Sequence, residues 1–395
     1  MKPLNFGVIG AGGYAKTHIE IINHLSKSNL SKLSAVVIRN PEKYKEIEND
    51  FKNNGIRIYR NYSEMFETEK GKLDVITIPS GIDTHEEQSV AALLAGFHVI
   101  CEKPVSGTIA EAFKMKEAAV KYNKKVAIGY QHIFSPSIQK IKEITINQEL
   151  GALKKVKGIA LLIRTGSYFK RNLWAGKIFY NGKKIYDSPI QNMTGHFLNN
   201  MLYLAGENRH DSAEPVFVYG ENYKANPIEC SDTQFIKVGC KNGVEIFFYT
   251  SIASDRTVEP FIELFYEKGK IEWYANDNGS AKVYSKNKKQ YEAIDEFDNG
   301  ETPIKELVFS NTISSINNNR EPLANIHNSL QHTICVEKSF DFFGEVQNIP
   351  AGFIEKIELA DKNGGNDFYF AVKGLSGIVK TLYEKEIGFS EKLAK

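Results

Sequence analysis

Short apolar runs alternate with amphipathic segments over the first 131 residues, and this alternation constrains the fold more than any other feature. The runs at residues 4–9, 33–38, 73–78, 97–102 and 125–129 have the length and branching of buried strands. The segments between them carry apolar faces and start signals of helices. Residues 1–131 are therefore predicted to form an α/β domain with a doubly wound parallel sheet.

The first apolar run leads into a glycine-rich turn, GAGGYA at residues 10–15. In such a turn Gly10 permits a tight bend, Gly12 lets backbone N–H groups approach a pyrophosphate, and Ala15 allows close packing of the next helix. The helix N-terminus adds a partial positive charge. A plain glycine turn is the alternative. Because the turn lies between a strand and a helix, we expect a dinucleotide site here, with Gly13 and Tyr14 as further members.

A lysine follows the run at residues 97–102 directly, within the sequence Glu102-Lys103-Pro104. A side chain in this position projects from the carboxyl end of a buried strand, which is where open α/β sheets bind their ligands. An ordinary surface lysine is the alternative. The glycine-rich turn before it favours a functional Lys103, with Glu102 beside the cofactor.

Other residues that follow predicted strands are further candidates for the cofactor site. NAD sites usually carry an acidic residue after the second strand, but this chain has Arg39. A guanidinium suits a 2′-phosphate, which slightly favours NADP, although Arg39 could instead stack on adenine or face solvent. The remaining candidates are Pro79, Ser80, His85 and Gln131.

The pattern changes after a linking helix expected near residues 135–146. Strands are predicted at residues 154–163, 216–223, 233–240, 244–250, 261–266 and 270–274, and Asn242-Gly243 is a strong hairpin signal. Residues 132–345 are therefore expected to form an α+β domain with an open, mostly antiparallel sheet. Helices would cover one face of this sheet, and the other face is a candidate oligomer interface. Residues 346–395 are expected to be a C-terminal helical extension.

One helix of the second half carries candidate catalytic side chains. Ser188-Pro189 predicts its start, and the apolar pattern continues to about Leu204. Within it Asn192 and His196 are spaced i, i+4 and would share one face. A lone helical histidine is usually structural or solvated, but this one accompanies amide side chains in an otherwise apolar helix. His196 is therefore a candidate general base.

The segment at residues 164–177, RTGSYFKRNLWAGK, lies between a predicted strand and this helix. Tyr168 and Trp174 offer aromatic faces, and Arg171 offers hydrogen-bond donors, which suits the recognition of a sugar. A loop anchored by a buried tryptophan is the alternative. We favour a substrate loop, because the segment leads directly to the predicted active-site helix.

Composition excludes several other classes of function. The chain has 395 residues and a formal net charge of +2, without a basic patch for nucleic acid or an anionic membrane. No apolar run is long enough to span a membrane, and the N-terminus shows no cleavable signal. The four scattered cysteines are expected to be reduced thiols of a cytoplasmic protein. His327 and His332 lack metal-site spacing, so no metal is expected.

The glycine turn, Glu102-Lys103-Pro104 and the Asn192/His196 pair together resemble the Gfo/Idh/MocA family, which includes glucose–fructose oxidoreductase and inositol dehydrogenase. The resemblance covers the chain to about residue 345. It implies a Rossmann domain followed by an α/β domain whose sheet often forms the dimer interface. A homodimer or homotetramer with a carbohydrate-like substrate is thus expected, as is hydride exchange between NAD or NADP and a sugar, polyol or glycoside.

Carried over by position, Lys103 resembles the active-site lysine of the family and His196 its active-site histidine. Many members have Asp where this chain has Asn192, and an amide can orient its neighbours only through hydrogen bonds. We therefore assign Lys103, His196 and Asn192 to catalysis, and expect all three to contact substrate. Two alternatives remain: a redox-neutral sugar lyase or glycosidase of the same fold, and a catalytically silent sugar or nucleotide sensor.

Overall fold

The computed structural model describes residues 2–287, 290–360 and 366–393, and it divides the chain into two compact units. The first comprises Met1–Phe134 and Pro303–Leu330, and the second comprises Ser135–Thr302 and Gln331–Lys395. This division differs from the predicted boundaries at 131 and 345, because residues 303–330 return to the first unit. There Phe309 packs against Phe6, with ring centroids 6.3 Å apart, and the Ile128 amide donates to the Ala324 carbonyl.

The first unit contains a six-stranded sheet in the order β3-β2-β1-β4-β5-β6, with every pair of neighbours parallel. This is the order of a dinucleotide-binding doubly wound sheet, which confirms the predicted fold class. The strands are β1 (Leu4–Ile9), β2 (Ser31–Val37), β3 (Arg57–Tyr59), β4 (Val75–Ile78), β5 (His98–Cys101) and β6 (Val126–Ile128). The helices are α1 (Ala15–Ser26), α2 (Lys45–Asn53), α3 (Tyr62–Glu69), α4 (His85–Leu94), α5 (Ile109–Lys121) and α9 (Ile304–Asn317).

Two helix starts of this unit test the capping signals of the sequence. The sequence Thr108-x-x-Glu111 predicts a capping box at the start of α5, and the structure has one, in which Thr108 and Glu111 satisfy each other's backbone N–H groups. Thr84-His85-Glu86-Glu87 predicts a second capping box, but this prediction is wrong, because the Thr84 side chain makes no capping bond to α4. The Thr84 hydroxyl instead contacts the Ser80 hydroxyl at 2.8 Å, within a short 3₁₀ turn that precedes the helix.

The second unit is built on a large sheet whose main path runs β16-β15-β14-β13-β7-β12-β11-β10-β17. Only β7/β12 and β10/β17 pair in parallel along this path, so the sheet is mostly antiparallel, as predicted. The strands are β7 (Leu153–Ile163), β10 (Pro215–Lys224), β11 (Thr233–Cys240), β12 (Glu245–Ser251), β13 (Ala253–Tyr266), β14 (Gly269–Tyr274), β15 (Ser280–Asn287), β16 (Gln290–Phe297) and β17 (Gln347–Asn348). Neither β15 nor β16 was predicted from the sequence. Strand β16 is exposed along most of its length and lacks an alternating apolar face.

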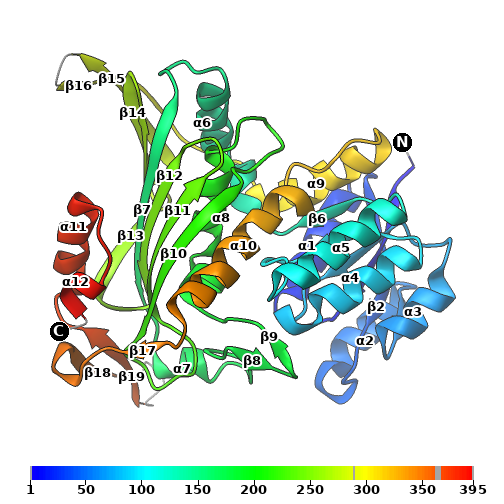
Figure 1. Ribbon diagram of the computed structural model, residues 1–395. Helices are drawn as coiled ribbons and strands as arrows, with labels where there is room; N and C mark the ends of the chain where they lie inside the picture. The colour runs from blue at the N-terminus through cyan, green and yellow to red at the C-terminus, as the bar shows by residue number, and fades with distance from the viewer. Residues whose placement is uncertain (1, 288–289, 361–365, 394–395) are drawn as a thin grey trace. The chain divides into compact units, whose positions relative to one another are not determined.

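Both faces of this sheet are covered. Helices α6 (Pro136–Ile146), α8 (Gly195–Leu204) and α10 (Ile326–Phe343) lie on one side, where Met201 packs closely over Gly158 and Phe248. The C-terminal segment covers the opposite face with α11 (Leu375–Lys385) and α12 (Ser390–Leu393) (Figure 1). Its buried Leu382 and Phe389 form a core cluster with Phe247 and Tyr249 of β12.

The C-terminal segment therefore differs from the predicted helical extension beside an open face. It starts with β17 and continues with β18 (Ile354–Ala360) and β19 (Asn366–Val372), which pair antiparallel, before its two helices. Residues 361–365 and 394–395 of the segment lie outside the described residues. The face expected to bind a second subunit is covered in its central part by the chain itself, because the apolar side of α11 buries the alternate side chains of the strands.

None of the helices in the described part of the chain has the length and apolarity needed to cross a membrane. Among the same residues, no group of three or more His, Cys, Asp or Glu side chains is arranged to hold a metal ion. Each of the four cysteines is buried as a free thiol.

Candidate active site

The glycine-rich turn links β1 to α1 in the conformation that its sequence predicts. Gly10 has a φ of 118° and Gly13 a φ of 57°, a region in which other residues are strained. A side chain at Gly10 would come within 3.4 Å of the Ala15 Cβ, which accounts for the small residue at position 15. The glycine turn and the N-terminus of α1 thus lie at the carboxyl edge of the sheet, where a helix N-terminus carries a partial positive charge.

The turn also contacts an aromatic residue that the sequence did not single out. A Cβ atom at Gly12 would lie 2.2 Å from the Tyr44 hydroxyl, so Tyr44 packs directly against the glycine backbone. Tyr44 ends the short turn η1 (Glu42–Tyr44), which follows exposed Arg39, and the Lys43 amine lies 5.5 Å from its ring centroid. Two cations and an aromatic ring thus lie within seven residues of the end of β2.

Glu102 occupies the position just beyond β5, and a histidine of α1 holds its side chain. His18 Nε2 lies 3.0 Å from Glu102 Oε1, and the His18 ring is 1 % exposed. Its edge packs on Phe309 of α9, with centroids 5.0 Å apart at 90°. A Cβ atom at Gly129 would lie 2.6 Å from the Glu102 carboxylate, so only glycine lets the carboxylate cross the end of β6. The sequence missed His18, although its place on the apolar face of α1 was visible.

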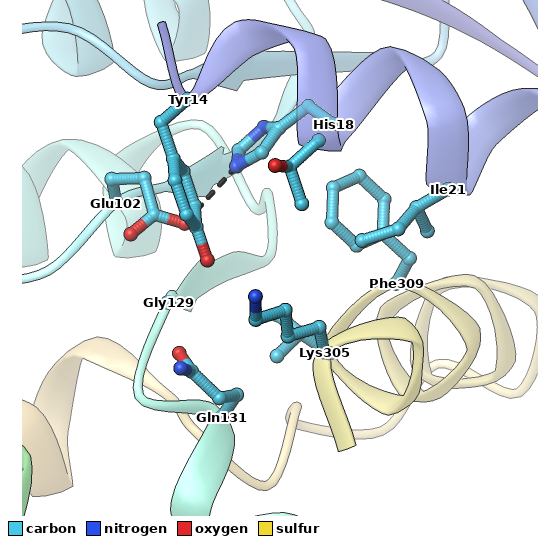
Figure 2. A pocket seen from close by; sticks show the side chains of 10 residues that line it. Tyr14, His18, Ile21, Glu102, Gly129, Gln131, Lys305 and Phe309 are labelled. Atoms are coloured by element: carbon cyan, nitrogen blue, oxygen red, sulfur yellow. Dashed lines mark hydrogen bonds and ion pairs between the residues drawn. The ribbon is translucent and has the colours of Figure 1, made fainter. Parts of the chain in front are cut away.

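A pocket opens where these groups meet (Figure 2). Its empty space is about 230 Å³ when counted out to its open mouth. Figure 2 shows the Lys305 amine and the Tyr14 hydroxyl pointing toward one another across it, with the Gln131 side chain nearby. Lys305 lies in the first turn of α9, 174 positions beyond Gln131, and such a separation gives no sequence signal. The other lining residues are Thr17, His18, Ile21, Glu102, Gly129, Val308 and Phe309.

Two lysines influence the histidine that follows Gln131. Burial, followed by the charges of Lys103 and Lys305, lowers the pKa of His132 to about 4. Because His132 is neutral near pH 7, the positive charge at this edge of the sheet is carried by the lysines. Positive charge at the carboxyl ends of β5 and β6 favours the binding of an anion or a developing alkoxide.

His85 lies in the interior and joins two of the predicted site segments. Its Nδ1 lies 2.8 Å from the Pro104 carbonyl oxygen and its Nε2 lies 3.2 Å from that of Ser80. Burial lowers the pKa of the His85 ring. This placement favours a role in positioning the Lys103 loop over the direct cofactor contact that the sequence suggested. Pro79 and Ser80 remain at the end of β4, beside this link.

In the second unit, the predicted helix from Ser188 to Leu204 is interrupted. A wide π turn, η4 (Pro189–Met193), comes first, and α8 begins at Gly195 after a break at Thr194. The Thr194 hydroxyl donates to the Pro189 carbonyl at 2.8 Å, which stabilises the break. Asn192 and His196 therefore belong to two different helical segments, and the expectation that they share one face of a regular α-helix is wrong. Both side chains are half-buried.

The predicted substrate loop forms an aromatic and guanidinium cluster. Its only helical turn is α7 (Gly166–Phe169), and the Arg171 guanidinium lies 3.7 Å from the Tyr168 ring centroid and 5.1 Å from that of Trp174. Burial, followed by the charge of Asp187, raises the pKa of Tyr168 to about 12. The structure thus brings Tyr168, Arg171 and Trp174 together, as the sequence suggested.

Asp187 connects this loop to the π turn, and no sequence pattern pointed to this role. Its side chain accepts hydrogen bonds from the Gly176 amide at 2.7 Å and from Asn192 Nδ2 at 2.8 Å. Arg171 Nη2 lies 3.6 Å from the same carboxylate. An acidic residue just before a helix start is common, so nothing in the pattern distinguishes Asp187.

Comparison with known proteins agrees with this geometry. Residues 4–130 match the model of the oxidoreductase family with an NAD-binding Rossmann fold. Glucose-6-phosphate 3-dehydrogenase of Bacillus subtilis is 25% identical over 50% of this chain and 53% of its own length. Inositol 2-dehydrogenase of Serratia proteamaculans is 26% identical over 38% of this chain and 43% of its own length. The matched part of the chain thus spans about half the length of these relatives.

Solved structures extend the likeness to the second unit. The WlbA dehydrogenase of Bordetella pertussis, in complex with NADH and UDP-GlcNAcA, has a TM-score of 0.72 at 19% identity, over 87% of this chain and 97% of its own. Levoglucosan dehydrogenase, in complex with NADH, has a TM-score of 0.73 at 16% identity with the same coverage. At these identities the likeness shows a shared fold. Residues 4–130, which carry the glycine turn and Glu102-Lys103-Pro104, are thus similar to the NAD-binding Rossmann domain of the Gfo/Idh/MocA oxidoreductases.

Proposed function

We propose that the protein is an NAD(P)-dependent oxidoreductase that transfers a hydride between nicotinamide and a hydroxyl-bearing carbon of a sugar, polyol or glycoside. The observation that carries this proposal is the position of Lys103, two residues beyond the end of β5 at the ligand-binding edge of an NAD-binding sheet. The names of the relatives support the substrate class, since inositol 2-dehydrogenase and glucose-6-phosphate 3-dehydrogenase both indicate oxidation at a ring hydroxyl.

The cofactor, when bound, supplies the hydride acceptor. We assign its pyrophosphate to the backbone of Gly10, Gly12 and Gly13, because this turn leads into the N-terminus of α1, whose partial charge is positive. The nicotinamide end is assigned to the pocket of Tyr14, Glu102 and Gln131. NADP is favoured over NAD at the other end, because Arg39 and Lys43 are exposed cations beyond β2.

Lys103, His196 and Asn192 carry the chemistry in this proposal. His196 accepts the hydroxyl proton while the hydrogen on the same carbon leaves as hydride, so that the alcohol becomes a carbonyl. The Lys103 ammonium stabilises the negative charge that develops on the oxygen. Asn192, which has no charge of its own, orients the substrate through hydrogen bonds.

We assign the sugar ring to the cluster of Tyr168, Arg171 and Trp174. Aromatic faces pack on the C–H face of a ring, and a guanidinium provides several donors for its hydroxyls. The protein is further proposed to work in the cytoplasm, which its buried free thiols support. A homodimer or homotetramer remains part of the proposal, with an interface outside the area that α11 covers.

The proposal is tested by incubating the protein with NAD and, separately, with NADP over a panel of sugars, polyols and glycosides. The panel includes glucose 6-phosphate, myo-inositol and levoglucosan, and the absorbance of reduced nicotinamide is followed. We expect one substrate to give a rise that is lost in His196→Ala. Products that form without net cofactor reduction would point to a redox-neutral lyase or glycosidase instead. Binding without any conversion would contradict an enzymatic role.

A further inference from the structure

A buried carboxylate organises the substrate half of the site, and neither the sequence nor the comparisons point to it. Asp187 is 6 % exposed and contacts three separate parts of the second unit. It accepts the Gly176 N–H on Oδ2 and the Asn192 side-chain N–H on Oδ1. The Arg171 guanidinium lies 3.6 Å from Oδ2. One carboxylate thus contacts the end of the substrate loop, its arginine and the π turn.

The hydrogen bond from Asn192 to Asp187 determines which end of the Asn192 side-chain amide, NH₂ or oxygen, faces Asp187. A carboxylate can only accept hydrogen bonds, so the end of the amide at Asp187 is the NH₂ group. The Asn192 oxygen is therefore directed away from Asp187. An amide oxygen can only accept, and a hydroxyl group of a sugar is a donor that it can hold.

The contact with Arg171 changes the electrostatics of the loop. The guanidinium is already beside a carboxylate and packs on the faces of Tyr168 and Trp174. These contacts hold the N–H groups of Arg171 in one orientation, and the negative charge of Asp187 partly neutralises the guanidinium. Such an arrangement favours an uncharged hydroxylated ring over an anionic group at this position.

We propose that Asp187 is a positioning residue that fixes the Asn192 amide and the Arg171 guanidinium in a single arrangement for binding an uncharged sugar ring. This inference rests on the proposed function, since it assigns the substrate half of that site. Asp187 acts through its two neighbours and takes no proton from the substrate.

Asp187→Asn is the sharpest first variant, because the new side chain keeps its size and can still accept the Gly176 N–H. It removes the charge beside Arg171 and no longer dictates the orientation of Asn192. We expect KM for the neutral sugar that turns over fastest to rise about tenfold or more, with a smaller fall in kcat. The preference for glucose over glucose 6-phosphate, measured as the ratio of kcat/KM, should fall as well.

The double variant Asp187→Asn/Asn192→Asp distinguishes two roles of Asp187: orienting the side chains that bind substrate, and merely stabilising the fold around them. It restores one carboxylate and one amide to the pair, with an acceptor at position 192, and is expected to recover most of the lost kcat/KM. Asp232→Asn is the matched control, because Asp232 is also buried and accepts a side-chain N–H of an asparagine, Asn226, at 2.8 Å. This control is expected to change the melting temperature without changing KM.

Trp174 gives a readout that needs no turnover. The chain has two tryptophans, and the other, Trp273, is buried with its indole N–H on the Ser137 hydroxyl. Release of Arg171 in Asp187→Asn should therefore change the emission of Trp174 alone, as a spectrum in the Trp273→Phe background will show. A wild type that converts no sugar would contradict the proposed function, while the Trp174 spectrum would still test the role of Asp187.

Two results would overturn the inference. One is Asp187→Asn with unchanged kinetic constants and an unchanged Trp174 spectrum. The other is a loss of activity that follows unfolding, with the same fall in melting temperature and the same unchanged KM in Asp187→Asn and Asp232→Asn.

Discussion

The two units position their candidate residues in different ways. In the first unit the residues follow the ends of regular strands, and the backbone of the sheet determines where they lie. Buried imidazoles then hold the loop, with His18 on Glu102 and His85 on Pro104. In the second unit the residues lie in a loop and a π turn, and the side chain of Asp187 connects them.

Because of this difference, we expect the two units to differ in how well they tolerate substitutions near the candidate site. A strand end is part of a sheet that nearby apolar residues define, so the cofactor half tolerates little rearrangement. A loop held by a few hydrogen bonds can alter its side chains without altering the sheet beneath it. We therefore expect variants of the first unit to change cofactor binding or the chemical step, and variants of the loop to change substrate affinity.

The largest expected effect tests the chemical role of the first unit. Lys103→Met should lower kcat by about 10²- to 10³-fold, because the developing oxyanion loses its charged donor. The dissociation constant for NADH, measured by fluorescence titration, should change little. Lys103→Arg keeps the charge and should retain more activity. An unchanged kcat in Lys103→Met would remove Lys103 from the mechanism.

The second effect concerns the C-terminal segment that covers the large sheet. Leu382→Ala removes a fully buried side chain of α11 and should lower the free energy of unfolding by about 2–5 kcal/mol. Urea unfolding followed by far-UV circular dichroism measures this loss. Glu384→Ala, at an exposed position of the same helix, should stay within about 0.5 kcal/mol of wild type. Equal stability of the two variants would mean that the segment does not stabilise the sheet.

A smaller effect concerns cofactor choice at the end of β2. Arg39→Ser should weaken NADP binding about tenfold through the loss of a charge-assisted hydrogen bond, with little change for NAD. Isothermal titration with both cofactors measures the two affinities. Arg320→Ser, an exposed arginine of the same unit, is the control. A parallel change in NAD and NADP affinity would contradict a contact with the 2′-phosphate.

The smallest effect is a pH dependence of stability at the edge of the first sheet. His132 has a pKa of about 4 in the folded chain, against about 6.5 when unfolded. Between these values only the unfolded chain binds the proton, so the contribution of His132 is complete above about pH 6.5 and is lost as the pH falls toward 4. At pH 5 the loss should be about 1–2 kcal/mol.

Urea unfolding at pH 7 and pH 5 measures this loss in wild type, and His132→Gln should lose less between the two values. His24→Gln, on the exposed side of α1, is the control and should behave as wild type. An equal pH dependence of wild type and His132→Gln would show that the histidine is not buried in its neutral form.

Regular patterns made the first unit predictable. Parallel strands buried on both faces are continuous apolar runs, so the strand ends that carry Lys103 and Gln131 could be located from sequence. The glycine turn was equally readable, because Gly10 and Gly13 adopt backbone angles that other residues disfavour. Hairpin signals and alternating residues likewise revealed most of the second sheet.

Contacts between distant segments were not readable. Lys305 reaches the pocket only because α9 returns to the first unit, and no local pattern records that return. Asp187 contacts Gly176 and Arg171 only once the loop has folded back on the π turn. The tail was misread for a similar reason, since its apolar side acquires a partner only when the sheet exists.

The sequence by itself determined which backbone segments become strands, helices and glycine turns, because periodic burial and glycine conformation are local properties. Tertiary structure alone decided which side chains meet at the candidate site. It broke the expected helix at Thr194, placed His18 on Glu102 and turned the Asn192 amide toward Asp187. These are hydrogen bonds and close contacts between separate segments, and their energies depend on a geometry that exists only in the folded chain.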